Sequence, residues 1–335
     1  MNTTIYGWAR RLPVPALRDH FELKYAALRR RPLLSELRKI PLATTGVETV
    51  DGREVPFVEF EDGTHLYGRF PTDFERRLYR EWKSELPTTI TEETMRVSID
   101  GFLRYLYPHV MPNLTLPYTR HERECLHPHH TETIEDIPGL SAEKKQRLKE
   151  LYRPKPGESF LDVGAYMGYP TVRMSKVLGP NGQITSLEAD PEGQWYLRQN
   201  VARNGATNVK IVPRAVWNRD DETLDLHKAG RQQNSLVTDV VNSAQTTPVP
   251  TTTIDTALGD RAADVMTLTV NGAEVEAIEG MTGLVGRNRP LRMSIAGWYK
   301  RDNRRICDIV APQLRELGFE LAISEKGRVL AWRGA

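Results

Sequence analysis

The chain has 335 residues, with 46 Lys and Arg against 44 Asp and Glu, a formal net charge of +2, and 39% hydrophobic residues. This length predicts two domains, or one domain with a large extension, and is ample for a hydrophobic core. The balanced charge argues against a partner that needs a strongly basic surface, such as nucleic acid or an anionic membrane.

The two cysteines, Cys125 and Cys307, lie far apart in the sequence, which excludes a disulfide framework and favours a reducing compartment. No apolar run approaches the roughly 20 residues that a membrane span needs. The N-terminal stretch "MNTTIYGWARRLPVP" lacks the apolar centre of a signal peptide. We therefore expect a cytoplasmic protein without a membrane span.

The N-terminal half predicts a mixture of helices and one hairpin. Residues 6–41 are basic with apolar residues at helical spacing, typical of a helical N-terminal segment packed on its own protein or, alternatively, of a helix on a membrane surface. Asp62-Gly63 predicts a hairpin turn, and helices are expected over 71–86 and 89–110. A short helix capped by Ser141 follows. The segment "RPKPGES" then separates residues 1–150, a helical and hairpin extension for acceptor binding or oligomerisation, from residues 151–335.

The second half alternates strand-like apolar runs with helical patterns, which predicts βαβ units and a mostly parallel sheet. The last two strands are separated only by "EKG", so one edge strand should run antiparallel. The expected strands are "SFLDVG", "GQITSLEA", "NVKIVPRAV", "DVMTLTV", "LRMSIAGW", "FELAIS" and "RVLAWR", and the expected helices cover 169–178, 191–204, 273–281 and 304–317.

A glycine-containing turn follows the first of these strands, in "FLDVGAYMGYP". Gly164 and Gly168 let the backbone approach a ligand closely, at the strand ends where open α/β sheets bind ligands. Tyr166 stands where a dinucleotide fingerprint would need its second glycine, so that fingerprint fails. The turn instead fits the Asp-x-Gly-x-x-x-Gly pattern, starting at Asp162, of S-adenosylmethionine (SAM)-dependent methyltransferases, with Ala165 and Tyr166 as further contact residues.

An acid ends the second strand of this half. Glu188 lies 20 residues beyond Gly168, where its carboxylate can accept hydrogen bonds from both ribose hydroxyls of a nucleoside, with Ala189 beside it. The alternative is a solvated acid at a strand end. After the third strand, Ala215 and Val216 would lie beside the adenine, unless they are simply core residues.

The order of these motifs resembles the FkbM family of class I methyltransferases, over roughly residues 158–333. The resemblance rests on "FLDVGAYMGYPT", "SLEADPEGQWYLRQNVARNGATNVKIVPRAV", "PVPTTTIDTAL", "DVMTLTVNGAEVEAIEGM" and "MSIAGWY". It implies a Rossmann-like seven-stranded sheet with its last strand antiparallel, and methyl transfer from SAM. The chain departs from the family where many members have Lys, Asp and Glu, because it has Thr267, Thr269 and Asn271 there.

The neutral side chains of Thr269 and Asn271 do not favour a metal ion, because hard cations prefer carboxylate oxygens. Asn271 is expected to position the donor's amino-acid end or the acceptor hydroxyl; alternatively, it caps the helix that starts at Ala273. Glu274, in the first turn of that helix, is a candidate general base.

Two further groups of residues are candidates for the acceptor side. In "YTRHERECLHPHH", His121 is our candidate general base, against a metal site or a surface role for the cluster. Trp298 and Tyr299 follow the fifth strand, where aromatic faces suit stacking on a sugar ring, or else pack into the core.

The motifs predict a SAM-dependent methyltransferase that acts without a metal. The resemblance to the FkbM family implies O-methylation, at a hydroxyl of a sugar, glycolipid or natural product. A non-catalytic nucleoside-binding or regulatory protein is the alternative. The failed fingerprint argues against a dehydrogenase, and "VNGAE" replaces the Asn/Asp-Pro-Pro-aromatic motif of many nucleic-acid methyltransferases. The expected partner is a small-molecule or glycan acceptor, with a homodimer left open.

Overall fold

The computed structural model describes residues 42–60, 65–68, 110–112, 134, 136–229, 234–261, 263–287 and 290–334. The chain divides into two compact units, residues 1–115 and residues 116–335. The helical segment expected over 6–41 and the cluster around His121 lie outside the described residues. The helix expected over 71–86 also lies outside them, as does all but the last residue of the helix expected over 89–110. The functional division near residue 150 stays a prediction.

The described part of the first unit contains an antiparallel sheet with the order β1-β2-β3-β4. Its strands are β1 (Leu42–Val50), β2 (Arg53–Phe60), β3 (His65–Gly68) and β4 (Val110–Pro112). The pairing of β2 with β3 agrees with the hairpin expected around Asp62-Gly63, although that turn is not among the described residues. A second hairpin joins β1 to β2 through Asp51 and Gly52, both with positive φ, as two-residue hairpin turns require.

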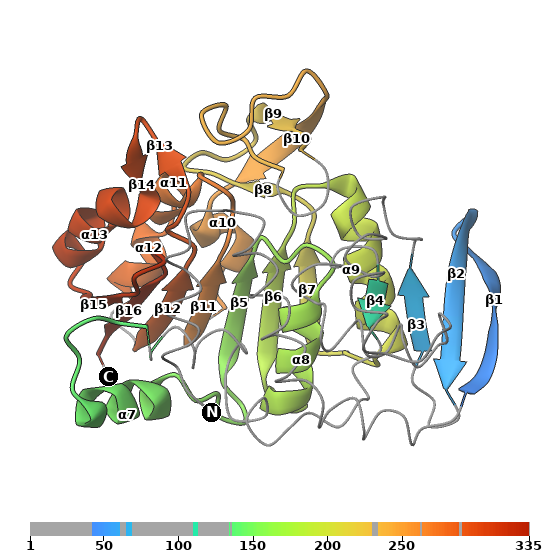
Figure 1. Ribbon diagram of the computed structural model, residues 1–335, viewed down its shortest axis with the longest axis horizontal. Helices are drawn as coiled ribbons and strands as arrows, with labels where there is room; N and C mark the ends of the chain where they lie inside the picture. Colours follow the sequence, from blue (N-terminus) through green and yellow to red (C-terminus); the bar gives the residue numbers. More distant parts are fainter. Residues whose placement is uncertain are drawn as a thin grey trace, which may run out of the picture. The chain divides into compact units, whose positions relative to one another are not determined.

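The second unit is built on a seven-stranded sheet with the order β15-β16-β12-β11-β5-β6-β7 (Figure 1). Only β16 runs in the direction opposite to the other six strands, which confirms a mostly parallel Rossmann-like sheet. The last strand of the chain, β16, is the antiparallel one, as the resemblance implies. The expectation that the antiparallel strand lies at an edge is wrong, because β16 inserts between β12 and β15. The bounds are β5 (Ser159–Val163), β6 (Gln183–Leu187), β7 (Val209–Val212), β11 (Val265–Leu268), β12 (Leu291–Ile295), β15 (Glu320–Ile323) and β16 (Val329–Arg333).

The helices of this unit largely follow the expected pattern. Ser141 caps the first, accepting a hydrogen bond from the Lys144 amide, and Asp190 caps α9 in the same way. Two short helices, α10 and α12, were not predicted. The helices are α7 (Ala142–Leu151), α8 (Tyr169–Leu178), α9 (Pro191–Arg203), α10 (Ile254–Leu258), α11 (Glu274–Glu279), α12 (Thr282–Gly286) and α13 (Ile306–Glu316).

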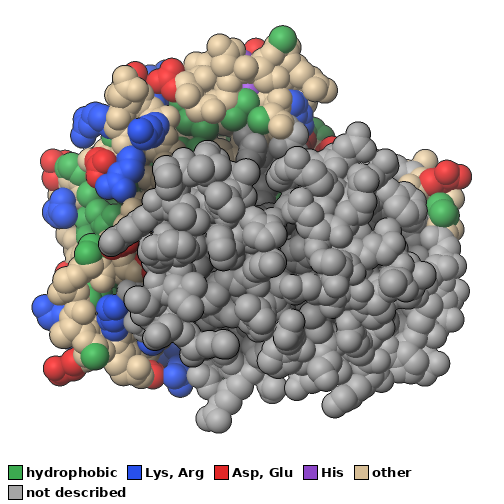
Figure 2. All heavy atoms as spheres, viewed as in Figure 1, with side chains coloured by type: hydrophobic (Ala, Val, Ile, Leu, Met, Phe, Trp, Pro, Cys, Tyr) green, Lys and Arg blue, Asp and Glu red, His purple; other side chains and the backbone are tan. Residues whose placement is uncertain are grey.

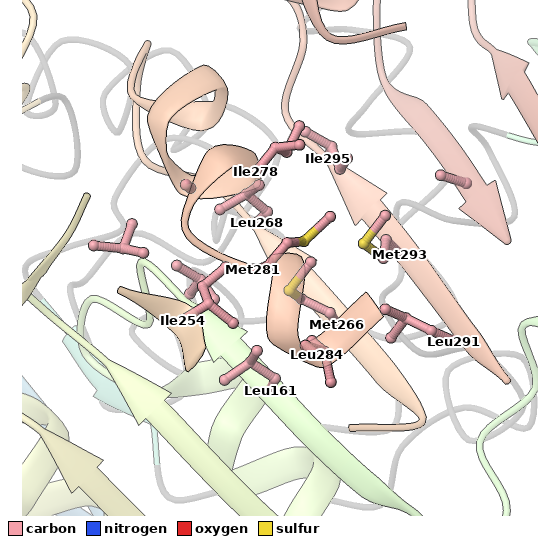
Figure 3. Packing of buried hydrophobic residues seen from close by; sticks show 14 of the residues in the cluster. Leu161, Ile254, Met266, Leu268, Ile278, Met281, Leu284, Leu291, Met293 and Ile295 are labelled. Carbon is pink, nitrogen blue, oxygen red and sulfur yellow. The ribbon is translucent and has the colours of Figure 1, made fainter. Parts of the chain in front are cut away.

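The two faces of the sheet carry separate cores, because alternate residues of a strand point to opposite faces. Leu161 of β5 and Met266 of β11 pack with Ile254 and Ile278 of the helices on one face (Figure 3). Phe160, one residue away from Leu161, belongs to the core that α7 and α8 cover on the other face. The carboxyl ends of β5, β6 and β11 are thereby held at one edge of a rigid sheet.

An insertion that the sequence analysis missed lies between β7 and β11. It contains β8 (Ala215–Val216), β9 (Thr223–His227) and β10 (Thr246–Thr252), in the sheet order β8-β10-β9. We call β9, β10 and the described residues 228–229 and 234–245 between them the arm. Figure 1 shows the arm above the carboxyl ends of β5 and β11. The alternation in "TLDLH" is a strand signal that could have revealed it.

Two further short strands, β13 (Lys300–Arg301) and β14 (Arg304–Arg305), form a small hairpin after β12. None of the helices in the described part of the chain has the length and apolar character that a membrane span requires. On the described part of the face in Figure 2, Lys and Arg side chains are interspersed with Asp and Glu. The described residues on that face thus form no large patch of a single sign.

Candidate active site

A cleft opens at the carboxyl ends of the parallel strands, where doubly wound sheets bind their ligands. It holds about 700 Å³ of empty space, including the part open to solvent. Its lining comes from the ends of β5, β6 and β11, from the segment after β7, and from the arm. The lining residues are Val163, Gly164, Tyr166, Leu187, Glu188, Ala189, Asp190, Arg214, Ala215, Val216, Leu226, Asn234, Leu236, Thr269, Val270, Asn271 and Ala273.

The glycine turn forms the floor of the cleft. Gly164 and Gly168 both have φ of 81°, in the left-handed region that favours glycine. The amides of Gly164 and Ala165 both donate to the Leu187 carbonyl, which ties the turn to β6. A methyl group on Gly164 would overlap the Thr269 carbonyl, and one on Gly168 would overlap the Leu197 side chain. Both glycines are therefore needed for packing between elements, in addition to any approach of a ligand.

Glu188 lies at the end of β6 with its carboxylate beside the glycine turn. One oxygen accepts from the Tyr166 amide at 2.6 Å, and the other accepts from the Asp190 amide at 2.8 Å. Burial raises the pKa of Glu188 to about 7, although the two backbone hydrogen bonds oppose this rise. Each carboxylate oxygen has a second lone pair, so Glu188 can still accept hydrogen bonds from a pair of hydroxyls in the cleft.

A small apolar cluster forms the wall next to Glu188. Ala215 after β7 and Leu226 of β9 are buried in it, with Ala189 and Leu236 packed against them. All four side chains also line the cleft. A flat aromatic base lying against these side chains would be partly removed from water, which is favourable for its apolar ring surface.

Asp162 is buried below the turn and does not line the cleft. Its carboxylate accepts from the Thr171 hydroxyl at 2.6 Å and from the Thr267 hydroxyl at 2.8 Å. Burial raises the pKa of this carboxyl, and the hydroxyl donors partly offset the effect. Asp162 thus connects β5 to α8 and β11. Thr267, one of the departures from the family pattern, is a partner of this carboxylate.

The joint between β11 and α11 is held by hydrogen bonds within the protein. Glu274 is fully buried, and its two carboxylate oxygens accept from the amides of Val270 at 3.0 Å and Gly272 at 2.8 Å. Burial also raises the pKa of Glu274 to about 7. Because Glu274 does not line the cleft, its contacts favour a structural role, and its role as a base stays a prediction.

Asn271 lines the cleft but does not cap the helix after it. Helix α11 begins at Glu274, and its N-cap residue is Ala273, which lacks a capping side-chain bond. The alternative role of Asn271 as a cap is therefore wrong. Its side-chain amide donates instead to the Asn234 carbonyl of the arm at 2.8 Å. The residue also has φ of 52°, a left-handed conformation that Asn tolerates better than most residues.

Trp298 and Tyr299 lie after β12 and outside the cleft lining. Trp298 is 37% exposed, and the guanidinium of Arg328 lies 4.8 Å from the centre of its ring. Tyr299 is partly buried against the main core, and burial raises the pKa of its hydroxyl. Their contact with an acceptor stays a prediction.

The cleft brings together most of the residues predicted for cofactor binding. Six of them line it: Gly164, Tyr166, Glu188, Ala189, Ala215 and Val216. Asp162, Ala165 and Gly168 support the turn from outside the lining. Sequence reasoning missed the contributions of Asp190 and of the arm, because the arm was not recognised as a structural element. Within the described ranges, no group of three or more His, Cys, Asp and Glu side chains is arranged to hold a metal ion.

Comparison with known proteins identifies the domain around this cleft. Residues 162–321 match the methyltransferase FkbM domain. The match spans 160 of the 335 residues, a little under half of the chain, and agrees with the resemblance in the order of the motifs. The FkbM domain is a SAM-dependent methyltransferase domain, and S-adenosyl-L-methionine is its cofactor.

Individual relatives match shorter stretches. A protein-L-isoaspartate O-methyltransferase of Aeropyrum pernix is 35% identical over 83 residues, which cover 25% of this chain and 30% of the relative. An arsenite methyltransferase of Halobacterium salinarum is 36% identical over 56 residues, covering 17% and 14%. The matched part thus spans less than a third of these two curated relatives. A crystal structure of methyltransferase FkbM from Methylobacillus flagellatus has a TM-score of 0.38 at 13% identity, covering 60% of this chain and 57% of that one.

The residues of the cleft fit this cofactor. Glu188 offers acceptors for ribose hydroxyls, and the apolar wall offers a surface for adenine. The glycine turn and the polar joint of β11 remain for the amino-acid end. Which of these groups binds which part of the cofactor stays a prediction.

Proposed function

We propose that the chain is a SAM-dependent O-methyltransferase that modifies a hydroxyl of a sugar, glycolipid or natural product without a metal ion. The observation that carries this proposal is the position of Glu188, a buried carboxylate open to the cleft and fixed by two backbone amides beside the glycine turn. Such an acid orients a nucleoside by its sugar.

The chain's own residues contribute mainly alignment. When bound, SAM supplies an activated methyl group for an in-line displacement. The glycine turn, Glu188 and the apolar wall fix the adenosine, which sets the direction in which the methyl group faces. Asn271 and Thr269, at the end of β11, line the cleft with neutral polar groups that can orient an acceptor hydroxyl. A general base such as His121 would take the proton of that hydroxyl.

A non-catalytic SAM-binding protein is the second candidate. It is favoured by a specific observation, because the Glu274 carboxylate and the Asn271 side-chain amide are both engaged by the backbone. The chain then would bind SAM through Glu188 without transferring its methyl group.

Two experiments test these proposals in turn. Thermal-shift and calorimetric titrations with SAM, S-adenosylhomocysteine and NAD should show binding of the first two ligands and none of NAD. A screen of sugar, glycolipid and polyketide acceptors with radiolabelled SAM should then yield a methylated hydroxyl. No binding of either adenosyl ligand by folded protein would refute both candidates, and binding without transfer to any acceptor would favour the second.

A further inference from the structure

One residue of the arm, Asn234, connects three elements around the cleft. Its side-chain amide donates to Asp190 at 2.8 Å, and its side-chain oxygen accepts from the Ala229 amide at 3.1 Å. Its main-chain carbonyl accepts from the side chain of Asn271 at 2.8 Å. Asp190 follows β6, Ala229 follows β9 and Asn271 follows β11, so Asn234 links opposite sides of the same opening.

The Asp190 end of this link is a buried charge cluster. Lys228 of the arm forms an ion pair with Asp190, and both side chains are largely buried. Asp190 also accepts from the Glu192 amide, as the N-cap of α9. Both carboxylate oxygens therefore already have protein donors. Separating such a buried pair would leave an uncompensated charge, so the pair holds the arm to the end of β6.

The Asn271 end is held by several contacts to the same segment of the arm. The buried hydroxyl of Ser235 donates to the Asn271 carbonyl at 2.7 Å, and Asn271 in turn donates to Asn234. A methyl group on Gly272 would overlap Val240, which shows how closely the arm lies on the joint. The segment that starts at Asn234 is thus fixed at both ends, and Leu236 within it is held in the apolar wall.

We propose that Asn234 is a positioning residue that fixes the arm across the cleft, from Asp190 to Asn271, and so holds Leu236 against the adenine of the donor. This inference rests on the proposed function, because it assumes that an adenosyl ligand occupies the cleft. It extends that function by assigning part of the apolar surface for the base to the insertion between β7 and β11 rather than to the sheet itself.

Calorimetric titration of three variants of the full chain tests the proposal, with S-adenosylhomocysteine and 5′-methylthioadenosine as probes. Asn234→Ala should weaken binding of both probes about tenfold, as expected for loss of a hydrogen bond to a charged group. The affinities for the two probes should fall by the same factor, because both probes contain the adenine. Asn234→Asp keeps the shape but places a second carboxylate beside Asp190, so it should weaken binding at least as much.

Asn242→Ala is the matched control, because Asn242 is an exposed amide on the same arm. It should bind both probes as the wild type does. Asn271→Ala cuts the other end of the link and replaces Asn234→Ala as the test if that variant does not fold. If both fold, the effects of the two substitutions should be less than additive, because both release the same segment.

The proposal is overturned if Asn234→Ala binds within twofold of the wild type, or if Asn234→Asp binds normally, which would show that the residue only fills space. If the wild type itself binds neither probe, both the proposed function and this inference are refuted. Binding by the wild type combined with unchanged binding by the Asn234 variants refutes the inference alone.

Discussion

Glu188 and Glu274 have nearly the same chemistry and different surroundings. Each follows the end of a parallel strand, each is buried, and each accepts hydrogen bonds from two backbone amides. Burial raises the pKa of both to about 7. Only Glu188 lines the cleft. A raised pKa and satisfied hydrogen bonds therefore do not separate a binding residue from a structural one here, whereas access to a ligand does.

The largest effect is expected when Glu274, the structural acid of the two, is removed. Glu274→Ala leaves the amides of Val270 and Gly272 without their acceptor in a buried turn, which should cost about 4 kcal/mol at about 2 kcal/mol for each unpaired donor. Chemical denaturation monitored by circular dichroism measures the change. A loss below about 1 kcal/mol would show that the joint does not depend on this carboxylate.

The glycine turn provides the next test, because its two glycines meet different neighbours. Gly164→Ala should destabilise the protein by about 3 kcal/mol, since the methyl group would overlap a backbone carbonyl that cannot move aside and φ is positive. Gly168→Ala should cost less, because it meets the end of the flexible Leu197 side chain. Thermal unfolding of both variants gives the order, and equal losses would contradict the packing argument.

Removing the binding acid should affect affinity more than stability. Glu188→Ala should weaken binding of S-adenosylhomocysteine about 100-fold, or about 2.7 kcal/mol, because the ribose hydroxyls lose a charged acceptor. Water in the open cleft can replace the acceptor for the Tyr166 and Asp190 amides, so the melting temperature should change less than in Glu274→Ala. Calorimetry measures the affinity and thermal unfolding measures the melting temperature. Unchanged affinity would show that Glu188 is not part of the binding site.

The smallest effect is on the pH dependence of binding. The pKa of Glu188 is about 7 in the free protein, and only the ionised carboxylate is a full acceptor for two hydroxyls. Affinity for S-adenosylhomocysteine should therefore rise about tenfold as the pH increases from 6 to 8. Glu188→Gln should flatten the profile. A profile of the same shape in Glu188→Gln would assign the titration to another group.

Local sequence signals predicted the sheet and the floor of the site well. The apolar runs located all seven strands of the main sheet, and the pattern around Gly164 and Glu188 located the cleft. These features are encoded in short stretches of sequence, because the alternation of a strand, the glycines of a turn and an acid at a strand end lie within a few residues of one another. The position of β16 inside the sheet depends instead on long-range pairing, which a hairpin signal does not specify.

The wall of the cleft was harder to predict, for a physical reason. Leu226, Asn234 and Leu236 reach the site only because the arm folds back over the ends of β5 and β11, and their function comes from contacts to Asp190 and Asn271. Nothing local to Asn234 indicates those partners. The role of Asn271 as a helix cap failed for a similar reason, since its amide bonds to a residue 37 positions away in the sequence.

The most direct test of the account is a crystal structure of the protein with S-adenosylhomocysteine. The account predicts both ribose hydroxyls within hydrogen-bond distance of the Glu188 carboxylate, and the adenine between Ala215 and Leu236. Adenosine bound elsewhere, or with its sugar facing away from Glu188, would contradict it.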